Sequence, residues 1–405
     1  MPDAFSRHDL DVGNIAGVTH RIELDPHVPF KERTRRVSPA DFNDLKRHLQ
    51  DLLAIGIIEE SHSPYASPIV LVRKKNGDLR MVVDYRRLNN LTKKDAYPLP
   101  RIEETFSLLS GSKWFTVLDL KSGYYQMEVE PSDRPKTAFT TPFRTWQFRR
   151  MPQGLTNSPA TFQRTMEKVM QGINLQEVVA FLDDLIIFSS SLEEHEERLM
   201  KVLKRVSDFG LKLSPSKCKF FQTSVKYLGH VISAEGIQPD PDKVAAVKEW
   251  PRPQTAKELR SFLGFTGYYR RFVREYARVV RPLNDLLKGD LAPRHKGPNS
   301  WPRKQSHPLG ALWTADCQAA FELIIEKLTS APVLAFSNWQ LPYVLHTDAS
   351  MTGLGAALYQ VQDGQTRVVA YASRGLSKSE KNYPVHKLEF LALKWAVSEK
   401  FHDYL

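Results

Sequence analysis

The stretch Val178-Val-Ala-Phe-Leu-Asp-Asp-Leu-Ile-Ile-Phe188 places two adjacent aspartates, Asp183 and Asp184, between two apolar runs. Apolar residues on both sides of the pair predict a buried β-hairpin with the carboxylates at its turn. Adjacent carboxylates near apolar surface repel each other and lose hydration, a cost that a bound cation would offset. A solvated turn is the alternative, although Asn or Gly would serve a turn without the repulsion. Taken alone, the pair leaves a metal site and an ordinary turn about equally open.

A second apolar segment carries a third carboxylate. Trp114-Phe-Thr-Val-Leu-Asp-Leu120 is strand-like and has Asp119 near its end. Two such strands can bring Asp119, Asp183 and Asp184 to one site, and their hard oxygen ligands favour Mg²⁺, which also bridges substrate phosphates. Two such ions clamp the attacking and leaving oxygens of an in-line phosphoryl transfer. Together the two segments predict polymerase or nuclease chemistry.

Composition narrows the class of protein. The chain has 405 residues, 41% of them hydrophobic, which excludes wholesale disorder and suggests roughly two to four domains. Its two cysteines, Cys218 and Cys317, are too few for a disulfide framework, a zinc knuckle or an iron–sulfur site. They indicate a reducing compartment, and no signal peptide or membrane span is visible, so we expect an intracellular, cytoplasmic protein without a membrane partner. The net charge of +11 favours a polyanionic partner.

The structural signals predict an α+β fold, because antiparallel hairpins are combined with segregated helices. A helix is expected from Ser38-Pro39 to Gly56 and another from 192 to 209, ended by Gly210. Ser158 is expected to cap a helix that has a proline in its first turn. Thr255-Ala-Lys-Glu258 is a capping box at the start of a helical region that runs to about 287.

Four ordered motifs resemble the reverse transcriptase of LTR retrotransposons, most closely the Gypsy type. They are Phe181-Leu-Asp-Asp184, Leu118-Asp-Leu-Lys-Ser-Gly-Tyr-Tyr-Gln126, Met151-Pro-Gln-Gly154 with Ser158-Pro-Ala-Thr-Phe-Gln163, and Tyr227-Leu-Gly-His230. The resemblance implies a right-hand polymerase (fingers, palm and thumb) followed by a partial ribonuclease H-like α/β domain. The segments expected on this basis are an extended N-terminal segment at 1–30, fingers and palm at 31–235, the thumb at 236–290, a basic linker at 291–311 and the ribonuclease H-like domain at 312–405.

The resemblance also assigns roles to single residues. Asp119, Asp183 and Asp184 would hold two catalytic Mg²⁺ ions, with Mn²⁺ able to substitute. Tyr124 would lie under the sugar of the incoming nucleotide, where its ring collides with a 2′-hydroxyl and so selects deoxynucleotides. Gln153 would line the nucleotide pocket. The alternative for Tyr124 is ordinary packing.

The nucleotide triphosphate is expected at a basic hairpin. Asn76-Gly77 is a strong signal for a two-residue turn, which pairs Lys75 with Asp78 and Arg73 with Arg80. This register would put Arg73, Lys75 and Arg80 on one cationic face that suits a triphosphate. The resemblance supports Arg80 and Lys75 as substrate-binding residues, with Lys74 a near competitor. A merely solvated charged hairpin is the alternative.

Nucleic-acid contacts are expected downstream. Tyr227, Leu228 and Gly229 resemble the hairpin that steadies the primer 3′ end. Between 251 and 310 the chain has 13 basic against 4 acidic side chains, so most of the net charge lies in the expected thumb and linker. The arginines beside the apolar helical positions there are expected to track phosphates independently of sequence, with a solvated basic helix as the alternative. They are Arg260, Arg270, Arg271, Arg274, Arg278 and Arg281.

The C-terminal region resembles the start of a ribonuclease H domain. Val344-Leu-His-Thr-Asp-Ala-Ser350 is a strand that carries Asp348, and Glu389 lies on a helix 41 residues later; both would bind Mg²⁺. The further aspartate that the family places after this glutamate does not match before Leu405. At most weak cleavage of hybrid RNA is therefore expected from this chain.

These features predict an RNA-directed, and also DNA-directed, DNA polymerase. Its expected partners are an RNA template, a DNA primer or RNA–DNA hybrid, and dNTPs, and a virus-like particle is the location implied by the resemblance. The alternative is a catalytically inactive, retrotransposon-derived remnant that binds nucleic acid without chemistry.

Overall fold

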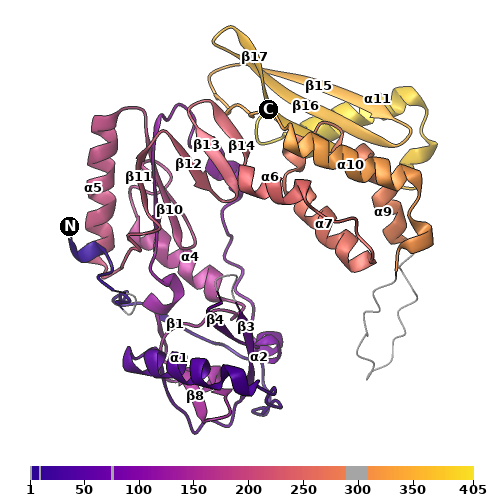
Figure 1. The fold of residues 1–405 in the computed structure, drawn as a ribbon. Coiled ribbons are helices and arrows are strands. Elements are labelled where there is room, and N and C mark those ends of the chain that lie inside the picture. The colour runs from indigo at the N-terminus through magenta and orange to yellow at the C-terminus, as the bar shows by residue number, and fades with distance from the viewer. Residues whose placement is uncertain (1, 9–10, 74–76, 289–307) are drawn as a thin grey trace. The chain divides into compact units, whose positions relative to one another are not determined.

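The computed structural model describes residues 2–8, 11–73, 77–288 and 308–405, which fall into two compact units (Figure 1). Unit 1 consists of Met1–Leu108 and Ser112–Thr223, and unit 2 of Leu109–Gly111 and Ser224–Leu405. Both units mix helices with mostly antiparallel strands, which confirms the α+β fold that the sequence predicted. No helix in the described ranges is both long and apolar enough to cross a membrane.

A four-stranded antiparallel sheet forms the centre of unit 1, in the order β11-β5-β10-β9. The bounds of its strands are β5 Trp114–Asp119, β9 Val178–Phe181, β10 Asp184–Ser189 and β11 Lys219–Gln222. Side chains on both faces of β10 are buried from Leu185 onwards, as its unbroken apolar run predicts. Helices α4 (Ser158–Val169) and α5 (Leu192–Asp208) pack their apolar faces into the core cluster that also contains residues of this sheet.

A second, five-stranded sheet of unit 1 has the order β2-β8-β7-β3-β4. Its strands are β2 Ile58–Glu60, β3 Ser67–Arg73, β4 Leu79–Val83, β7 Phe139–Thr140 and β8 Thr145–Phe148. The pairing of β3 with β7 is parallel and the other pairings are antiparallel. A short parallel pair joins β1 Thr19–His20 to β6 Glu128–Val129.

The helices of unit 1 end where the sequence indicated. Gly56 and Gly210, which follow α1 and α5, have φ values of 70° and 71°, the left-handed conformation that favours glycine at a helix end. The predicted cap of α4 is wrong by one residue, because Asn157 is the N-cap and Ser158 is already helical. The bounds are η1 Pro2–Ala4, η2 Pro39–Asp41, α1 Phe42–Ala54, α2 Arg86–Leu91, α3 Ile102–Ser107, η3 Gly123–Gln126, η4 Arg134–Thr137, α4 Ser158–Val169 and α5 Leu192–Asp208.

The register of the β3–β4 hairpin differs from the predicted one. Arg73 pairs with Leu79, and Val72 pairs with Arg80. The connection between the two strands therefore consists of residues 74–78 and not of the two residues Asn76 and Gly77. A shift of one residue moves a side chain to the other face of a strand. Arg73 and Arg80 therefore lie on opposite faces, and the predicted shared cationic face is wrong for this pair.

The position of Arg73 has a clear electrostatic cause. Its guanidinium contacts the carboxylates of Asp41 and Asp44 at 2.5 and 2.8 Å, from η2 and α1. The predicted pairing of Lys75, and the competing choice of Lys74, lie outside the described residues.

The first part of unit 2 is a three-stranded antiparallel meander followed by short helices. The predicted helical region from 255 to about 287 is divided, because Glu275 has a left-handed φ of 57°. Thr255 caps α7 as predicted, accepting a hydrogen bond from the Glu258 amide at 3.2 Å. The elements are β12 Ser224–Tyr227, β13 His230–Ser233, β14 Gly236–Pro239, α6 Pro241–Lys248, α7 Ala256–Tyr268, η5 Arg270–Phe272, α8 Tyr276–Val279 and α9 Arg281–Lys288.

Residues 289–307, which include most of the predicted basic linker, lie outside the described residues. The described chain resumes at Pro308, which pairs with Thr255, and continues into α10. The elements that follow are η6 Gly310–Leu312, α10 Ala315–Thr329, β15 Tyr343–Ser350, β16 Gly353–Gln362, β17 Gln365–Gly375, η7 Glu380–Asn382, α11 Val385–Trp395 and the π-helical turn η8 Ala396–Lys400.

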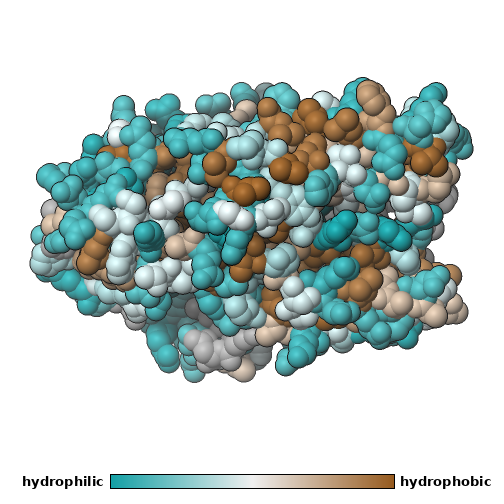
Figure 2. All heavy atoms as spheres, turned by 90° about the horizontal axis from the view of Figure 1, so that it is seen from above, coloured by the Kyte–Doolittle hydropathy of each residue, from teal (hydrophilic) through white to brown (hydrophobic). Residues whose placement is uncertain are grey.

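The last part of unit 2 is the antiparallel sheet β15-β16-β17 with α11 packed on one face. Ala392 and Trp395 of α11 enter the core of this sheet. The outer face of α11 is also apolar, since Phe390 and Leu393 are 69% and 45% exposed, and Val397 of the following turn η8 is 41% exposed. Figure 2, a view onto one face of the molecule, shows brown apolar groups among hydrophilic ones. Within the described chain, α11 thus buries only one of its two apolar faces.

A substitution at Gly236 tests the close packing of β14 against Leu334 in unit 2. It has a φ of 135°, and an added Cβ would meet the carbonyl oxygen of Leu334. We expect Gly236→Ala to lower the free energy of unfolding by about 2 kcal/mol or more, measured by urea denaturation. Gly264→Ala on α7, where a Cβ meets nothing within 4 Å, is the matched control and should be neutral or stabilising by up to about 1 kcal/mol. Equal stability of the two variants would contradict this packing.

Candidate active site

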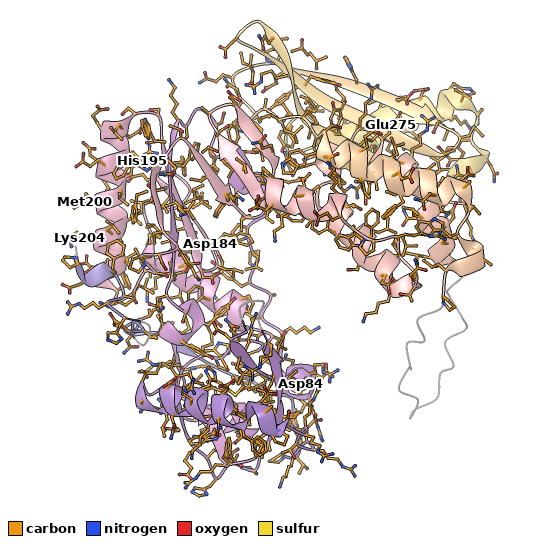
Figure 3. The ribbon with its side chains drawn as sticks, viewed as in Figure 1. Asp84, Asp184, His195, Met200, Lys204 and Glu275 are labelled. Atoms are coloured by element: carbon orange, nitrogen blue, oxygen red, sulfur yellow. The ribbon has the colours of Figure 1, made fainter. Side chains whose placement is uncertain are left out.

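Three aspartates come together where β5, β9 and β10 meet. Asp119, the last residue of β5, is the register partner of Asp184, the first residue of β10. Asp183 lies in the two-residue turn between β9 and β10. Figure 3 marks the position of Asp184 within unit 1. The hairpin and the convergence of the three carboxylate-bearing positions are as the sequence predicted.

The turn itself is held by a buried amide. Gln163 of α4 donates a hydrogen bond to the Ala180 carbonyl at 2.9 Å and accepts one from the Leu182 amide at 2.8 Å. Leu182 has a left-handed φ of 53°, which is costly for a residue with a branched side chain. The side-chain amide of Gln163 thus stabilises the strained turn that carries Asp183.

A glycine permits close packing beside Asp183. Gly123 begins η3, and a Cβ there would lie 3.1 Å from the Asp183 Cβ and 3.2 Å from the Phe162 ring. These distances are tighter than nine in ten real Cβ contacts, so a larger residue would require Asp183 or Phe162 to shift by a few tenths of an ångström. The Ser-Gly of the Leu118–Gln126 motif therefore has a steric role next to the carboxylates.

Negative charge is concentrated at this site. Burial, and then the charges of Asp183 and Asp119, raise the pKa of Asp184 from its usual 3.8 to about 6. The nearby ammonium of Lys217 acts in the opposite direction. Its Nζ lies 3.0 and 3.3 Å from the two carboxylate oxygens of Asp119. Sequence reasoning missed this lysine, which is 98 positions from Asp119 and belongs to none of the recognised motifs.

The donor set fits a hard divalent cation. Carboxylate oxygens from three neighbouring positions are the ligands that Mg²⁺ prefers, and their mutual repulsion is what a cation would relieve. In the described ranges, no three His, Cys, Asp or Glu side chains are yet close enough to hold an ion as they stand. The chemistry of the residues therefore fits a metal, while the present orientation of the side chains is not that of a bound site.

Tyr124 lies beside the carboxylates. Its ring makes an edge-to-face contact with Phe162, with centroids 5.2 Å apart. Burial, and secondly the charge of Asp183, raise the pKa of Tyr124 to about 12, so the phenol stays neutral. A fixed ring next to the carboxylates is the arrangement that the predicted selection against a 2′-hydroxyl requires.

Two predicted substrate-binding residues contact each other directly. Arg80 of β4 donates a hydrogen bond to the side-chain oxygen of Gln153 at 3.1 Å. The contact links two sequence motifs 73 residues apart. Lys75, which was also predicted to bind substrate, lies outside the described residues.

The Tyr227-Leu-Gly229 segment forms the tight turn between β12 and β13 in unit 2. Leu228 and Gly229 are both left-handed, with φ values of 46° and 72°. The hydroxyls of Tyr268 and Tyr269 donate to the carbonyls of Leu228 and Gly229 at 2.6 and 2.9 Å. Tyr227 is buried, so only the two turn residues present surface.

The expected basic surface of the thumb is smaller than the sequence suggested. Arg270 donates to the carbonyl of Ser373, and Arg271 is buried. Arg271 therefore does not belong to an exposed phosphate-tracking face, which corrects the prediction from helical spacing for this residue, whereas Arg270 is exposed in spite of its hydrogen bond. Arg278 and Arg281 remain exposed on the same side of unit 2, although they pair with acidic neighbours.

The two predicted nuclease carboxylates lie on the elements expected for them. Asp348 is on β15 and the exposed Glu389 is on α11. Alternation along β15 packs Leu345 and Ala349 against the α11 side, which places Asp348 on the opposite face of the sheet. There Asp348 shares a narrow gap with Glu275. The structure thus does not bring the two carboxylates together.

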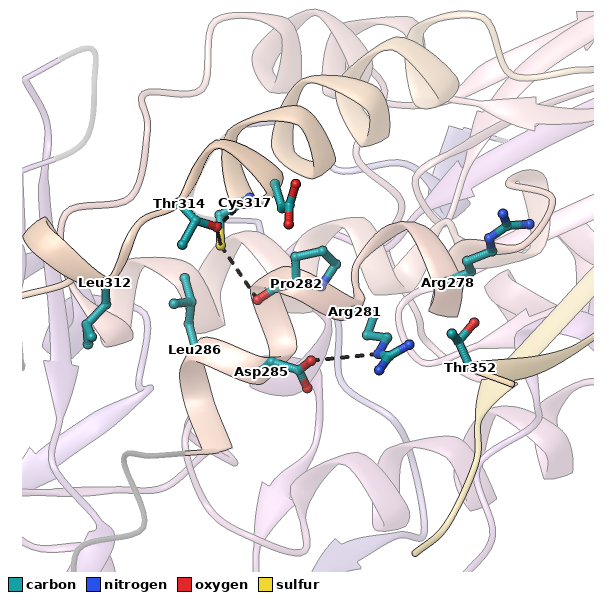
Figure 4. Close-up of a pocket in the computed structure, with 10 residues that line it drawn as sticks. Arg278, Arg281, Pro282, Asp285, Leu286, Leu312, Thr314, Cys317 and Thr352 are labelled. Atoms are coloured by element: carbon teal, nitrogen blue, oxygen red, sulfur yellow. Dashed lines mark hydrogen bonds and ion pairs between the residues drawn. The ribbon is translucent and has the colours of Figure 1, made fainter. Parts of the chain in front are cut away.

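Unit 2 also contains a cavity of about 660 Å³ beside α8, α9 and the start of α10 (Figure 4). Its lining residues are Arg278, Arg281, Pro282, Asp285, Leu286, Leu312, Thr314, Asp316, Cys317 and Thr352. The buried thiol of Cys317 faces the Pro282 carbonyl, with Sγ and O 3.7 Å apart. The cavity holds no group of carboxylates comparable to that of unit 1, so the candidate chemistry lies at the aspartates.

Comparison with protein families gives two matches. Residues 72–232 match the family described as reverse transcriptase (RNA-dependent DNA polymerase). Residues 313–405 match the RNase H-like domain found in reverse transcriptase. The first match includes the three aspartates of unit 1, and the second includes Asp348 and Glu389.

Similar curated proteins are polyproteins of transposons. The chain is 40% identical over 359 residues to the retrovirus-related Pol polyprotein from transposon opus of Drosophila melanogaster, covering 87% of this chain and 35% of that protein. It is 36% identical over 409 residues to the Pol polyprotein from transposon gypsy of the same organism, covering 99% and 38%. The transposon Tf2-3 polyprotein of Schizosaccharomyces pombe is 35% identical, with 94% and 27% covered. The chain thus spans about a third of the length of these relatives.

Solved structures show the same fold. A foamy viral protease-reverse transcriptase in complex with double-stranded DNA superposes with a TM-score of 0.86 at 23% identity, covering 99% of this chain and 67% of that one. The same viral enzyme in complex with RNA/DNA hybrid gives a TM-score of 0.82 at 22% identity, covering 97% and 51%.

Asp184 offers a test of the site's electrostatics. Because its pKa is raised on folding, the protonated form contributes stability that is fully present below about pH 4 and lost as the pH rises through about 6. Asp184→Asn, which cannot ionise, should therefore gain thermal stability relative to the parent at pH 7.5 and not at pH 4, in buffer containing EDTA. Asp208→Asn on α5 is the control for an exposed aspartate away from the site, whose carboxylate pairs with Lys204. A stability difference for Asp184→Asn that does not change with pH would show that the carboxylate cluster is not strained.

Proposed function

Because this chain belongs to the reverse transcriptases of retrotransposon Pol polyproteins, we propose that it acts as an RNA-directed and DNA-directed DNA polymerase. One observation carries the proposal: Asp119 and Asp184 are register partners on adjacent strands, with Asp183 in the adjoining turn. A turn with neutral side chains would stabilise this hairpin better, so the carboxylates are not explained by a structural role. It fits an enzyme that binds divalent cations and transfers a phosphoryl group.

The three aspartates would hold Mg²⁺, or Mn²⁺ in its place. Two such ions, when bound, supply activation of the primer 3′-hydroxyl and stabilisation of charge on the α-phosphate and the leaving pyrophosphate. The protein's own contribution is to hold the carboxylates at strand ends whose positions the sheet fixes. Gln163 and Gly123 maintain the turn on which Asp183 lies.

The substrate would be a deoxynucleoside triphosphate. Arg80, joined to Gln153, presents a guanidinium suited to phosphate oxygens, and we assign Lys75 to the same role from its motif. Tyr124 would lie beneath the sugar and exclude a 2′-hydroxyl by contact. These residues would orient the nucleotide for in-line attack, which is most of what a phosphoryl-transfer enzyme must do.

The proposed partners are a template and a primer. The structural neighbours were solved with double-stranded DNA and with RNA/DNA hybrid, and the net charge of +11 favours such polyanions. The Leu228–Gly229 turn, fixed by two tyrosine hydroxyls, suits a role in holding the primer end. We propose that hybrid cleavage by Asp348 and Glu389 is weak at most, because Asp348 lies on the sheet face opposite to α11, the helix that carries Glu389.

Primer extension by an Asp183→Asn variant tests the polymerase assignment. On an RNA template with a DNA primer, we expect dNTP incorporation to fall by more than about a hundredfold, since even outer-shell partners of metal ligands cost up to that much. Binding of the template–primer, followed by fluorescence anisotropy, should remain near that of the parent. Asp208→Asn, an equal change of charge on the outside of α5, should extend primers normally.

The inactive-remnant alternative gives a different result in the same assay. It predicts no incorporation by the parent chain in either Mg²⁺ or Mn²⁺, together with salt-sensitive binding that none of the aspartates affects. That outcome would end the enzyme assignment.

A substitution at Tyr124 tests nucleotide selection. Tyr124→Ala should raise incorporation of ribonucleotides relative to deoxynucleotides by roughly 10- to 200-fold, the range expected when one steric contact is removed. Tyr124→Phe keeps the ring and should retain the selectivity of the parent. If Tyr124→Ala discriminates as strictly as the parent, the ring does not contact the sugar.

A further inference from the structure

Asp119 already has a cationic partner in this chain. The Nζ of Lys217 lies 3.0 Å from Oδ1 and 3.3 Å from Oδ2, so one ammonium bridges both carboxylate oxygens. The Lys217 side chain is 64% exposed and that of Asp119 22% exposed. The ammonium can therefore leave into water, whereas the carboxylate is held at the end of a buried strand.

The backbone fixes Lys217 at this place. Leu120 and Leu213 form an antiparallel bridge, and the amide of Ser214 donates to the carbonyl of Asp119 itself at 2.8 Å. The amides of Lys217 and Cys218 both donate to the Ser214 carbonyl, at 3.1 and 3.2 Å. The turn from Ser214 to Cys218 is thus anchored to the backbone of Asp119, and it places the Lys217 side chain beside the carboxylate of Asp119.

Lys217 is also placed selectively among the three aspartates. Across the described part of the chain, neither Asp183 nor Asp184 forms an ion pair, while Asp119 forms one through both oxygens. These are the oxygens that a divalent cation on Asp119 would need. A lysine ammonium and a metal ion cannot occupy the same lone pairs of one carboxylate at once.

We propose that Lys217 is a resident counter-cation of Asp119, which holds this carboxylate in the metal-free protein and must leave it before a divalent cation binds. The proposal rests on the proposed function, because it concerns the same carboxylates. Lys217 is a positioning residue in this scheme: it keeps the Asp119 carboxylate oriented, and it competes with the metal. Binding of the metal to Asp119 is thereby coupled to the release of one flexible cationic side chain beside the site.

An ordinary surface ion pair is the competing explanation. Many exposed lysine–carboxylate pairs have no measurable consequence. In that case the contact would reflect only proximity, and removing the ammonium would change metal binding no more than removing any other nearby positive charge.

Direct titration with Mn²⁺ separates these explanations without relying on activity. The full chain, free of nucleic acid and nucleotide, is titrated while free Mn²⁺ is followed by electron paramagnetic resonance. Lys217→Met should bind Mn²⁺ about two- to fivefold more tightly than the parent, the range that an exposed ion pair of this kind can compete for. Lys217→Arg keeps the charge and should bind with an affinity close to that of the parent.

Lys219→Met is the matched control. It removes the same charge two residues away, from an exposed position on β11 that makes no contact with the aspartates. Its Mn²⁺ affinity should stay within the error of the parent value. An unchanged or weaker affinity of Lys217→Met overturns the proposal, and so does an equal tightening by Lys219→Met, which would show an effect of net charge alone.

Asp119→Asn distinguishes this proposal from the proposed function. If it weakens Mn²⁺ binding while Lys217→Met changes nothing, the metal site stands and the counter-cation role fails. If Asp119→Asn leaves Mn²⁺ binding unchanged, both fail, because Asp119 is then no ligand. Thermal unfolding of each variant without metal confirms that the same folded protein is compared.

Discussion

β5 and β10 pair along their whole length, and this pairing sets Asp119 directly opposite Asp184. The arrangement opposes folding locally, because carboxylates beside apolar strands lose hydration and repel each other. Burial, and then the charges of Asp183 and Asp119, raise the pKa of Asp184 to about 6. The surrounding contacts hold the cluster in spite of it. Gln163 bonds to the strained turn, Gly123 leaves space for Asp183, and Lys217 neutralises Asp119.

The residues around the aspartates have a consistent division of labour. Those that touch the β9–β10 turn are buried and uncharged, and they fix geometry. Those expected to meet the substrate, such as Arg80, are exposed and already engaged in a polar contact with a neighbour. Fixed carboxylates with movable cations are suited to phosphoryl transfer, where catalysis consists mainly of positioning and electrostatic stabilisation.

Much of the fold and the centre of the site could be predicted because the signals were local. Apolar runs on both sides of Asp183 and Asp184 predicted the hairpin, and the strand that ends at Asp119 predicted a third carboxylate. The hairpin register at Arg73 was predicted wrongly, because Asp41 and Asp44 from a different element attract its guanidinium. The contact of Lys217 with Asp119 could not be predicted from sequence spacing, because the two residues are 98 positions apart. A turn that is hydrogen-bonded to the backbone of Asp119 brings Lys217 there.

Asp119 and Asp183 are proposed to hold divalent cations in a nucleotidyl-transfer site. A crystal structure of the chain with template–primer, a non-hydrolysable dNTP analogue and Mn²⁺ tests it most directly through the anomalous signal of the metal. We expect anomalous density between these two carboxylates and the triphosphate, with the Lys217 ammonium displaced from Asp119. A bound nucleotide with no anomalous density at the aspartates, and with Lys217 still on Asp119, would contradict it.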